Sequence, residues 1–203
     1  FSIARFAKRI TPNSVFNSTG VHTPTYTTRA DLTDHVVQKM IDRSYKVVVF
    51  DFDLTIVKIH TFFGGITPSN IHTRQLFDDF ADPVLFQEIV QKLQQNHIQV
   101  AIASFGSKKV IETYLKAALP QESQYITILS RESSLTKSKM LKKLAESNEV
   151  AISTDQVVLF DDDEKNCRSC KKKGYQAYVV DTNAGMPGLT QKFWQNWLYP
   201  SRQ

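Results

Sequence analysis

The sequence contains few cysteines and no long apolar run. Cys167 and Cys170 are the only cysteines among 203 residues, and they lie one helical turn apart. No second Cys or His pair is placed to complete a zinc site, and the pair lacks the strand context of a redox CxxC motif. We therefore expect two reduced, buried helix residues, which suit an intracellular compartment. No apolar stretch approaches the length of a membrane span.

Acidic residues are absent before Asp31. Four of the 25 basic residues precede it, which leaves 21 basic against 20 acidic residues from position 31 onward. The net charge of residues 31–203 is therefore close to zero, which argues against a basic groove for nucleic acid. The first 30 residues are basic and rich in Ser and Thr, and two interpretations stay open for them. They are either a mitochondrial targeting segment or a basic tail on a cytoplasmic protein.

The length suits one domain with appendages, and no internal repeat or low-complexity tract is present. We expect an extended basic arm over residues 1–30, a catalytic domain over 31–182 and an aromatic tail over 183–203. Four large apolar side chains of the tail suit either core packing or an exposed docking patch: Phe193, Trp194, Trp197 and Leu198.

Two predicted strands run into carboxylates. The first leads into Asp51 and Asp53, whose side chains point the same way because extended chain has a period of two. The second leads into Asp161 and Asp162. Apolar runs of this kind suit strands buried in a parallel sheet, where ligands bind at the carboxyl ends. Two such ends would gather oxygen ligands for a hard divalent cation, which predicts Mg²⁺.

Predicted helices alternate with these strands along the chain. Strands are expected at 45–51, 97–104, 125–129, 156–161 and 177–180. Helices are expected at 31–43, 73–80, 83–96, 107–118, 137–147 and 166–173. The alternation predicts an α/β fold, a three-layer Rossmann-like arrangement with helices on both faces of a central parallel sheet.

Four motifs, in order, resemble the catalytic set of the haloacid dehalogenase (HAD) superfamily, and the similarity covers about residues 45–180. The first is a DxDxT motif, formed by Asp51, Asp53 and Thr55, and the second is a strand that ends in a hydroxyl residue, Ser104. The third is a lysine, either Lys137 or Lys139. The fourth is a DDxxxN motif, formed by Asp161, Asp162 and Asn166. The nearest branch is the capless, magnesium-dependent phosphatase-like one.

The resemblance implies a Mg²⁺-dependent phosphomonoester hydrolase that works through an aspartyl-phosphate. Asp51 is the expected nucleophile, Asp53 the general acid and base, and Lys137 the balancing cation. The expected metal ligands are Asp51, Asp162 and the backbone carbonyl of Asp53.

Other residues of the set are expected to bind phosphate or to support the ligands. The phosphate-binding group comprises Ser104, Phe105, Gly106 and Thr55. Asp161 and Asn166 are expected behind the metal ligands, with Asn166 either orienting Asp162 or Lys137 or capping the next helix. His60 and His72 flank a predicted flap over 56–70 and could touch substrate, but isolated histidines are more often surface residues, so neither is included in the site.

Two intervals leave the expected site open. Positions 52–103 already have to hold the flap, two helices and a strand, and positions 105–136 are fewer. Since neither has room for a substantial cap domain, we expect a substrate that is a phosphoprotein or a small phosphoester. A second interpretation is an accessory subunit of a larger assembly, such as a mitochondrial one, held by its terminal segments, with vestigial or secondary catalysis. A third interpretation, a nucleic-acid end phosphatase, conflicts with the near-zero net charge of residues 31–203.

Overall fold

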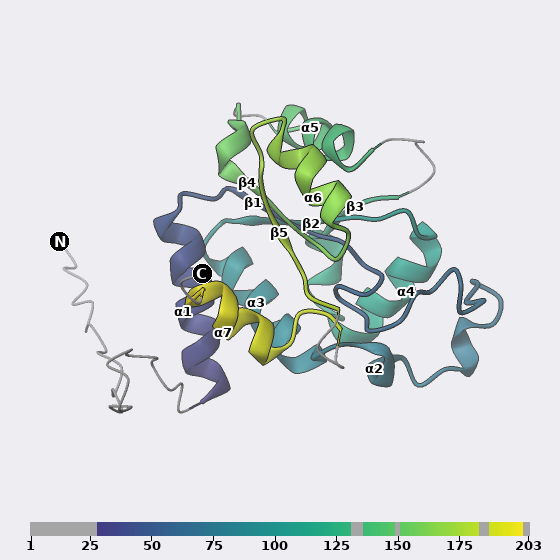
Figure 1. Cartoon of the computed structure of the whole chain (residues 1–203). Helices are drawn as coiled ribbons and strands as arrows, with labels where there is room; N and C mark the ends of the chain where they lie inside the picture. Colours follow the sequence, from purple (N-terminus) through teal and green to yellow (C-terminus); the bar gives the residue numbers. More distant parts are fainter. Residues whose placement is uncertain (1–27, 131–135, 149–150, 183–186, 201–203) are drawn as a thin grey trace, which may run out of the picture.

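A five-stranded, all-parallel sheet forms the centre of the fold (Figure 1). The computed structural model describes residues 28–130, 136–148, 151–182 and 187–200. The strands are β1 (Val47–Phe50), β2 (Gln99–Ala103), β3 (Thr127–Leu129), β4 (Val157–Asp161) and β5 (Gln176–Val179), in the order β3-β2-β1-β4-β5. The chain order reverses direction at β1, between its neighbours β2 and β4, so the sheet has a topological switch point there. The predicted parallel α/β fold is confirmed.

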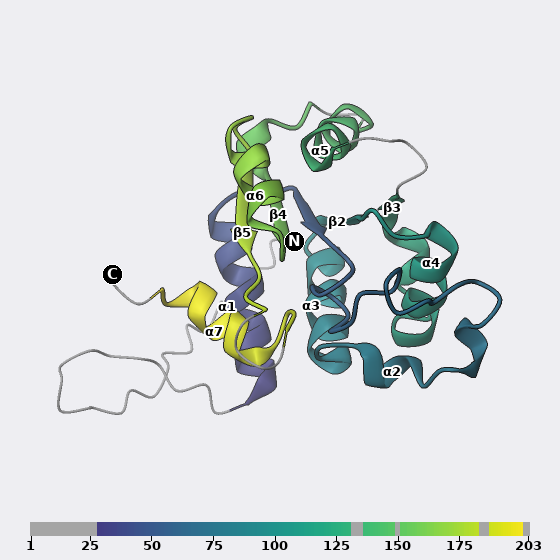
Figure 2. The same cartoon turned by 45° about the vertical axis from the view of Figure 1, so that its right-hand side comes forward.

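Helices cover both faces of the sheet (Figures 1 and 2). One layer contains α1 (Arg29–Asp42), α3 (Pro83–Gln95), α4 (Lys108–Ala118) and α7 (Gln191–Leu198), and the other contains α5 (Lys137–Glu146) and α6 (Glu164–Lys171). Along β1, Val48 and Phe50 pack into the first layer, whereas Val47 and Val49 pack into the second. This alternation explains why all four β1 residues are buried, and it confirms the three-layer arrangement.

The first described residues begin α1. Thr28 is the N-cap, and Asp31 completes a capping box with it, so helix formation starts within the segment predicted as an arm. The rest of the predicted arm, residues 1–27, lies outside the described residues. Val36 and Met40 of α1 are fully buried in the first hydrophobic layer. The predicted helix at 31–43 is therefore confirmed.

The C-terminal aromatic residues belong to the core. Trp194 and Trp197 of α7 are buried in the same cluster as the α1 side chains, and the Trp194 ring lies 5.0 Å from that of Phe160 in β4. Lys39 of α1 donates hydrogen bonds to the last carbonyls of α7, at Trp197 and Leu198. Core packing is therefore the correct interpretation of these tryptophans, and an exposed docking patch is wrong for them.

The predicted helix at 73–80 is mostly wrong. The structure has a 3₁₀ turn at Ile71–Thr73 and a single helical turn, α2 (Leu76–Asp79). Asp79 accepts side-chain hydrogen bonds from Arg74 and Tyr114, and Phe80 adopts an extended conformation that pairs with Val57. The contacts with Tyr114 and Val57 join distant parts of the chain, and they outweigh the local helical pattern.

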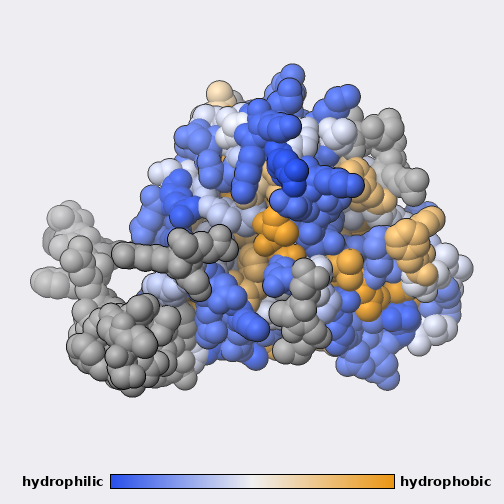
Figure 3. All heavy atoms as spheres, in the orientation of Figure 1, coloured by the Kyte–Doolittle hydropathy of each residue, from blue (hydrophilic) through white to orange (hydrophobic). Residues whose placement is uncertain are grey.

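No additional domain interrupts the described part of the sheet. The segment between β1 and β2 holds the flap, α2 and α3, and the described part between β2 and β3 holds α4 and a 3₁₀ turn at Ser123–Tyr125. Within the described ranges, no helix has the length and apolar character needed to cross a membrane. The face of the molecule in Figure 3 is largely hydrophilic, with apolar residues in a few places.

Candidate active site

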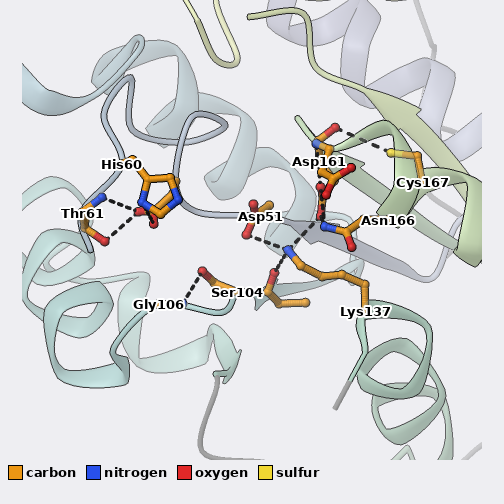
Figure 4. Close-up of polar contacts among 12 residues, drawn as sticks. Asp51, His60, Thr61, Ser104, Gly106, Lys137, Asp161, Asn166 and Cys167 are labelled. Atoms are coloured by element: carbon orange, nitrogen blue, oxygen red, sulfur yellow. Dashed lines mark hydrogen bonds and ion pairs between the residues drawn. The ribbon is translucent and has the colours of Figure 1, made fainter. Parts of the chain in front are cut away.

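The carboxyl ends of the adjacent strands β1 and β4 bring the predicted aspartates together (Figure 4). Phe50 of β1 pairs in register with Phe160 of β4, and the amide of Asp51 donates to the Phe160 carbonyl at 2.8 Å. Asp51 and Asp161 therefore emerge side by side at the switch point. Both side chains are buried: Asp51 is 8% exposed and Asp161 is 0% exposed.

Lys137 connects these two carboxylates. Its ammonium lies 2.7 Å from Oδ1 of Asp51 and 2.8 Å from Oδ2 of Asp161, and it donates to the Ala103 carbonyl at 2.5 Å. Lys137 is the first residue of α5, and Met140, Leu141 and Leu144 anchor that helix in the core. Lys139 points to solvent. Of the two lysines left open by the sequence, the structure brings only Lys137 to the aspartates.

Burial and charge shape the protonation of this cluster. Burial alone would lower the pKa of the Lys137 ammonium, but attraction to Asp51 and Asp161 outweighs it and raises that pKa above its ordinary value. Burial, together with the charges of Asp51 and Asp161, raises the pKa of Asp162 to about 7. Three carboxylates around one ammonium leave an excess of negative charge.

The same three carboxylates form a candidate metal site. Asp51, Asp161 and Asp162 each offer an oxygen within 4.8 Å of the others. A hard divalent cation would offset the excess negative charge, and oxygen donors are the ligands it prefers, so the residues fit such an ion. The sequence assigned Asp161 a supporting role and named the Asp53 carbonyl as a ligand. In the structure, Asp161 is part of the acidic group, and it is also the partner of Lys137.

Asn166 supports Asp161. Its amide donates to Oδ1 of Asp161 at 3.0 Å, and the backbone amide of Asp163 donates to the same oxygen at 2.9 Å. The hydrogen bond of the Asn166 amide thus goes to Asp161 rather than to Asp162 or Lys137, and Asp163 is the N-cap of α6. Asn166 remains a supporting residue behind the acidic group.

The turn after β2 forms the opposite wall of the site. Ser104 is buried, and its Oγ accepts a hydrogen bond from the Gly106 amide at 3.1 Å. Phe105 is exposed, and its ring lies 5.2 Å from the Lys137 ammonium. A cavity of about 390 Å³ opens between this turn and the aspartates. Its lining includes Asp51, Asp53, Leu54, His60, Phe62, Phe63, Ser104, Phe105, Gly106, Asp162, Asp163 and Asn166.

Thr55, predicted to bind phosphate, does not line this cavity. Its side chain is fully buried, its Oγ1 has no hydrogen-bond partner among the described residues, and its carbonyl accepts from the Leu189 amide at 2.9 Å. Leu54 has a φ of 55°, a left-handed conformation that turns the chain after Asp53. The threonine thus supports the loop from behind, and the structure does not place it for phosphate binding.

Asp53 is held by two residues that the sequence did not assign to the site. The hydroxyl and the amide of Thr61 donate to Oδ1 of Asp53 at 2.7 and 3.1 Å. Nδ1 of His60 lies 3.3 Å from Oδ2 of the same carboxylate. His60 also lines the cavity while its side chain remains 39% exposed, so it lies where it could touch substrate. The His-Thr pair follows Asp53 in the flap, but no local pattern indicated that the flap folds back onto it.

Cys167 and Cys170 lie behind the acidic group in α6. Both are free and buried, as predicted, and they pack against α5 and the sheet. Burial, with the nearby charge of Asp161, raises the pKa of each thiol to about 12. The thiols therefore stay protonated, as expected for core residues.

The sequence matches the family model described as Acid Phosphatase over residues 43–203, which is most of the chain. The chain belongs to the acid phosphatase family. No curated protein matches the sequence of this acid phosphatase family member. The match includes every residue of the candidate active site, and it establishes a phosphatase of the HAD-like type.

One solved structure supports the fold of this acid phosphatase family member. The N-terminal part of a Bacteroides fragilis protein, containing a phosphatase domain complexed with Mg, superposes with a TM-score of 0.54 at 16% identity and covers 81% of the chain. The chain spans only 43% of that structure. The 3-deoxy-D-manno-octulosonate 8-phosphate phosphatase of Moraxella catarrhalis gives a TM-score of 0.45 at 18% identity, covering 67% of each chain. The first likeness shows a HAD-like Rossmann fold.

Proposed function

We propose that this protein is a Mg²⁺-dependent phosphomonoester hydrolase that forms an aspartyl-phosphate on Asp51. The observation that carries the proposal is the environment of that carboxylate. Asp51 is held by the buried Lys137, lies within the acidic group and lines the cavity opposite Ser104. Membership of the acid phosphatase family supplies the reaction class.

Asp51 is positioned as a nucleophile. Its Oδ1 is engaged by Lys137, which leaves the second oxygen to attack phosphorus. As the bond from Asp51 to phosphorus forms and the ester P–O bond breaks, Asp53 donates a proton to the departing oxygen. Asp53 then takes a proton from the water that hydrolyses the acyl phosphate, which returns both carboxyl groups to their starting states.

The remaining site residues stabilise charge. Asp51, Asp161 and Asp162 would hold Mg²⁺, which when bound supplies charge neutralisation and alignment of the phosphoryl group. The Lys137 ammonium stays protonated because its pKa is raised, so it offsets charge on the nucleophile and the phosphoryl oxygens. The Ser104 hydroxyl and the Phe105 amide would bind the phosphoryl oxygens, and the Gly106 amide, which donates to Ser104 Oγ, would hold that hydroxyl in place.

The rim of the cavity favours a leaving group with an apolar surface. Three phenylalanines that line the cavity have exposed side chains: Phe62 at 65%, Phe63 at 81% and Phe105 at 46%. Exposed aromatic rings around a polar centre can contact a side chain or an apolar group attached to the phosphate. The open site is consistent with a phosphoprotein or a small phosphoester.

The first test measures hydrolysis of an aryl phosphate with Mg²⁺ and with a chelator. We expect turnover only with Mg²⁺, and trapping of the enzyme by a phosphate-mimicking fluoride complex. Asp51→Asn removes the nucleophile and should lower kcat by at least about 10⁴-fold. Asp78→Asn is the matched control, because Asp78 is exposed and does not line the cavity. Equal activity of Asp51→Asn and wild type would refute the proposal.

The alternative function, an accessory subunit held by its terminal segments, would depend partly on a C-terminal docking patch. The burial of Trp194 and Trp197 removes the main apolar groups from that patch. Wild-type protein that lacks turnover on every phosphoester tested, and that migrates in a large complex, would favour this alternative.

A further inference from the structure

The carboxyl group of Asp53 has two unlike oxygens. Oδ1 accepts two hydrogen bonds from Thr61, one from the hydroxyl at 2.7 Å and one from the amide at 3.1 Å. Oδ2 accepts no hydrogen bond in the described part of the chain, although Nδ1 of His60 lies 3.3 Å away. Asp53 is 9% exposed and lines the cavity, so water competes little for either oxygen.

Thr61 is itself firmly placed in the flap. It is 2% exposed, and its carbonyl accepts from the Ile66 amide at 2.9 Å. The Gly64 amide donates to the His60 carbonyl at 2.8 Å, and Gly65 adopts a φ of 66° that closes the turn. Ile66 is buried in the main hydrophobic core and anchors the far side of this turn. A rigid element therefore presents the Thr61 hydroxyl to Asp53.

We propose that Thr61 is the positioning residue for proton transfer by Asp53; this inference rests on the proposed function. Because Oδ1 of Asp53 already accepts two hydrogen bonds from Thr61, the exchangeable proton of the carboxyl group is directed to Oδ2. A carboxyl group with one oxygen tethered also keeps one rotamer, so Oδ2 is held ready for the leaving oxygen. Thr61 does not line the cavity, so it acts through Asp53.

The chemistry gives this role a distinctive signature. While the bond from Asp51 to phosphorus forms and the ester P–O bond breaks, the Oδ2 proton moves to the departing oxygen, leaving the Asp53 carboxylate. An alkoxide or simple phenoxide needs that proton in order to leave, whereas a dinitrophenolate is stable without it. Loss of positioning therefore slows poor leaving groups much more than good ones.

The test compares phenyl phosphate with dinitrophenyl phosphate as substrates of Thr61→Val. Valine keeps the shape and the backbone hydrogen bond but removes the hydroxyl. We expect kcat/KM for phenyl phosphate to fall by about 10- to 100-fold, and that for dinitrophenyl phosphate by less than about 3-fold. Thr61→Ser restores the hydroxyl and should recover most of the phenyl phosphate activity. The ratio of the two activities does not depend on the fraction of folded protein.

Thr67→Val is the matched control, because Thr67 lies in the same flap, is exposed and bonds to Ser69 rather than Asp53. Its activity ratio should equal that of wild type. Equal losses on both substrates in Thr61→Val, or an unchanged ratio, would overturn the positioning role while leaving the phosphatase proposal intact. Wild type without Mg²⁺-dependent turnover, or a fully active Asp51→Asn, would overturn both.

Discussion

Two buried ionic clusters in this protein differ in their balance of charge. Around Lys137, two carboxylates share one ammonium, a third lies in the same acidic group, and the cluster faces a cavity. Around Asp79, a guanidinium and a phenol satisfy a single carboxylate. The first cluster has more negative than positive charge and suits an added cation, whereas in the second the positive and negative charges balance. Burial of charge alone does not identify a functional site; the imbalance does.

The balanced cluster serves the fold. Arg74 donates to both oxygens of Asp79, at 2.9 and 2.7 Å, and the Tyr114 hydroxyl of α4 donates to the same carboxylate. Burial raises the pKa of the Asp79 carboxyl, but the hydrogen bonds from Arg74 and Tyr114 outweigh it and hold the pKa below its ordinary value. The cluster thus fastens the short helix α2 onto α4.

The largest expected effect comes from Lys137→Met, which removes the ammonium that pairs with Asp51 and Asp161. With chelator present, two buried carboxylates lose their partner, and the free energy of unfolding should fall by about 3–5 kcal/mol. Mg²⁺ should recover part of this loss, because it replaces the missing positive charge. Denaturant unfolding with and without Mg²⁺ measures both values.

Lys139→Met is the control for this variant, since Lys139 lies two residues away in the same helix and is exposed. It should match wild type in stability and in response to Mg²⁺. If Lys137→Met were as stable as this control in chelator, the comparison between the two clusters would lose its basis.

A smaller effect is expected from Asp79→Asn in the balanced cluster. The variant loses charge-assisted hydrogen bonds, but Arg74 is partly exposed and can be rehydrated, so the free energy of unfolding should fall by about 1–3 kcal/mol. This loss should be the same with Mg²⁺ and with chelator. Asp78→Asn, at the exposed neighbouring position, should change little. A Mg²⁺-dependent loss in Asp79→Asn would show that the clusters are coupled.

The smallest expected effect is the pH dependence of the stability that the Asp79 cluster contributes. The pKa of Asp79 is lower in the folded state than in the unfolded chain, so its stabilising contribution is fully present above the unfolded value of about 4. The contribution is lost as pH falls through the folded value. The stability gap between wild type and Asp79→Asn should therefore shrink between about pH 5 and pH 3. A constant gap over that range would contradict this assignment.

Some features of the site could be predicted from local pattern. The apolar runs before Asp51 and Asp161 indicated buried parallel strands, and parallel strands present their carboxyl ends at one edge. Lys137 was one of two candidates because it begins a helix with apolar residues at helical spacing. These inferences succeeded because the strand period, the helix period and the strand direction are short-range properties.

Other features depended on how distant segments meet. Thr55 turned into the core, since the left-handed Leu54 redirects the chain and Leu189 bonds to its carbonyl. Thr61 and His60 reached Asp53 only because the flap folds back over the strand end. No spacing in the sequence encodes which side chain a loop returns to.

The sequence by itself determined the class of this protein: an α/β phosphatase with aspartates at the switch point of a parallel sheet. The tertiary structure alone decided which lysine pairs with Asp51, that Asp161 joins the acidic group, and that Thr61 holds Asp53. The physical reason is the separation along the chain over which each kind of interaction acts. Periodicity and strand direction act over a few residues, whereas the charge balance and hydrogen bonds of a buried site arise only when separate segments exclude water together.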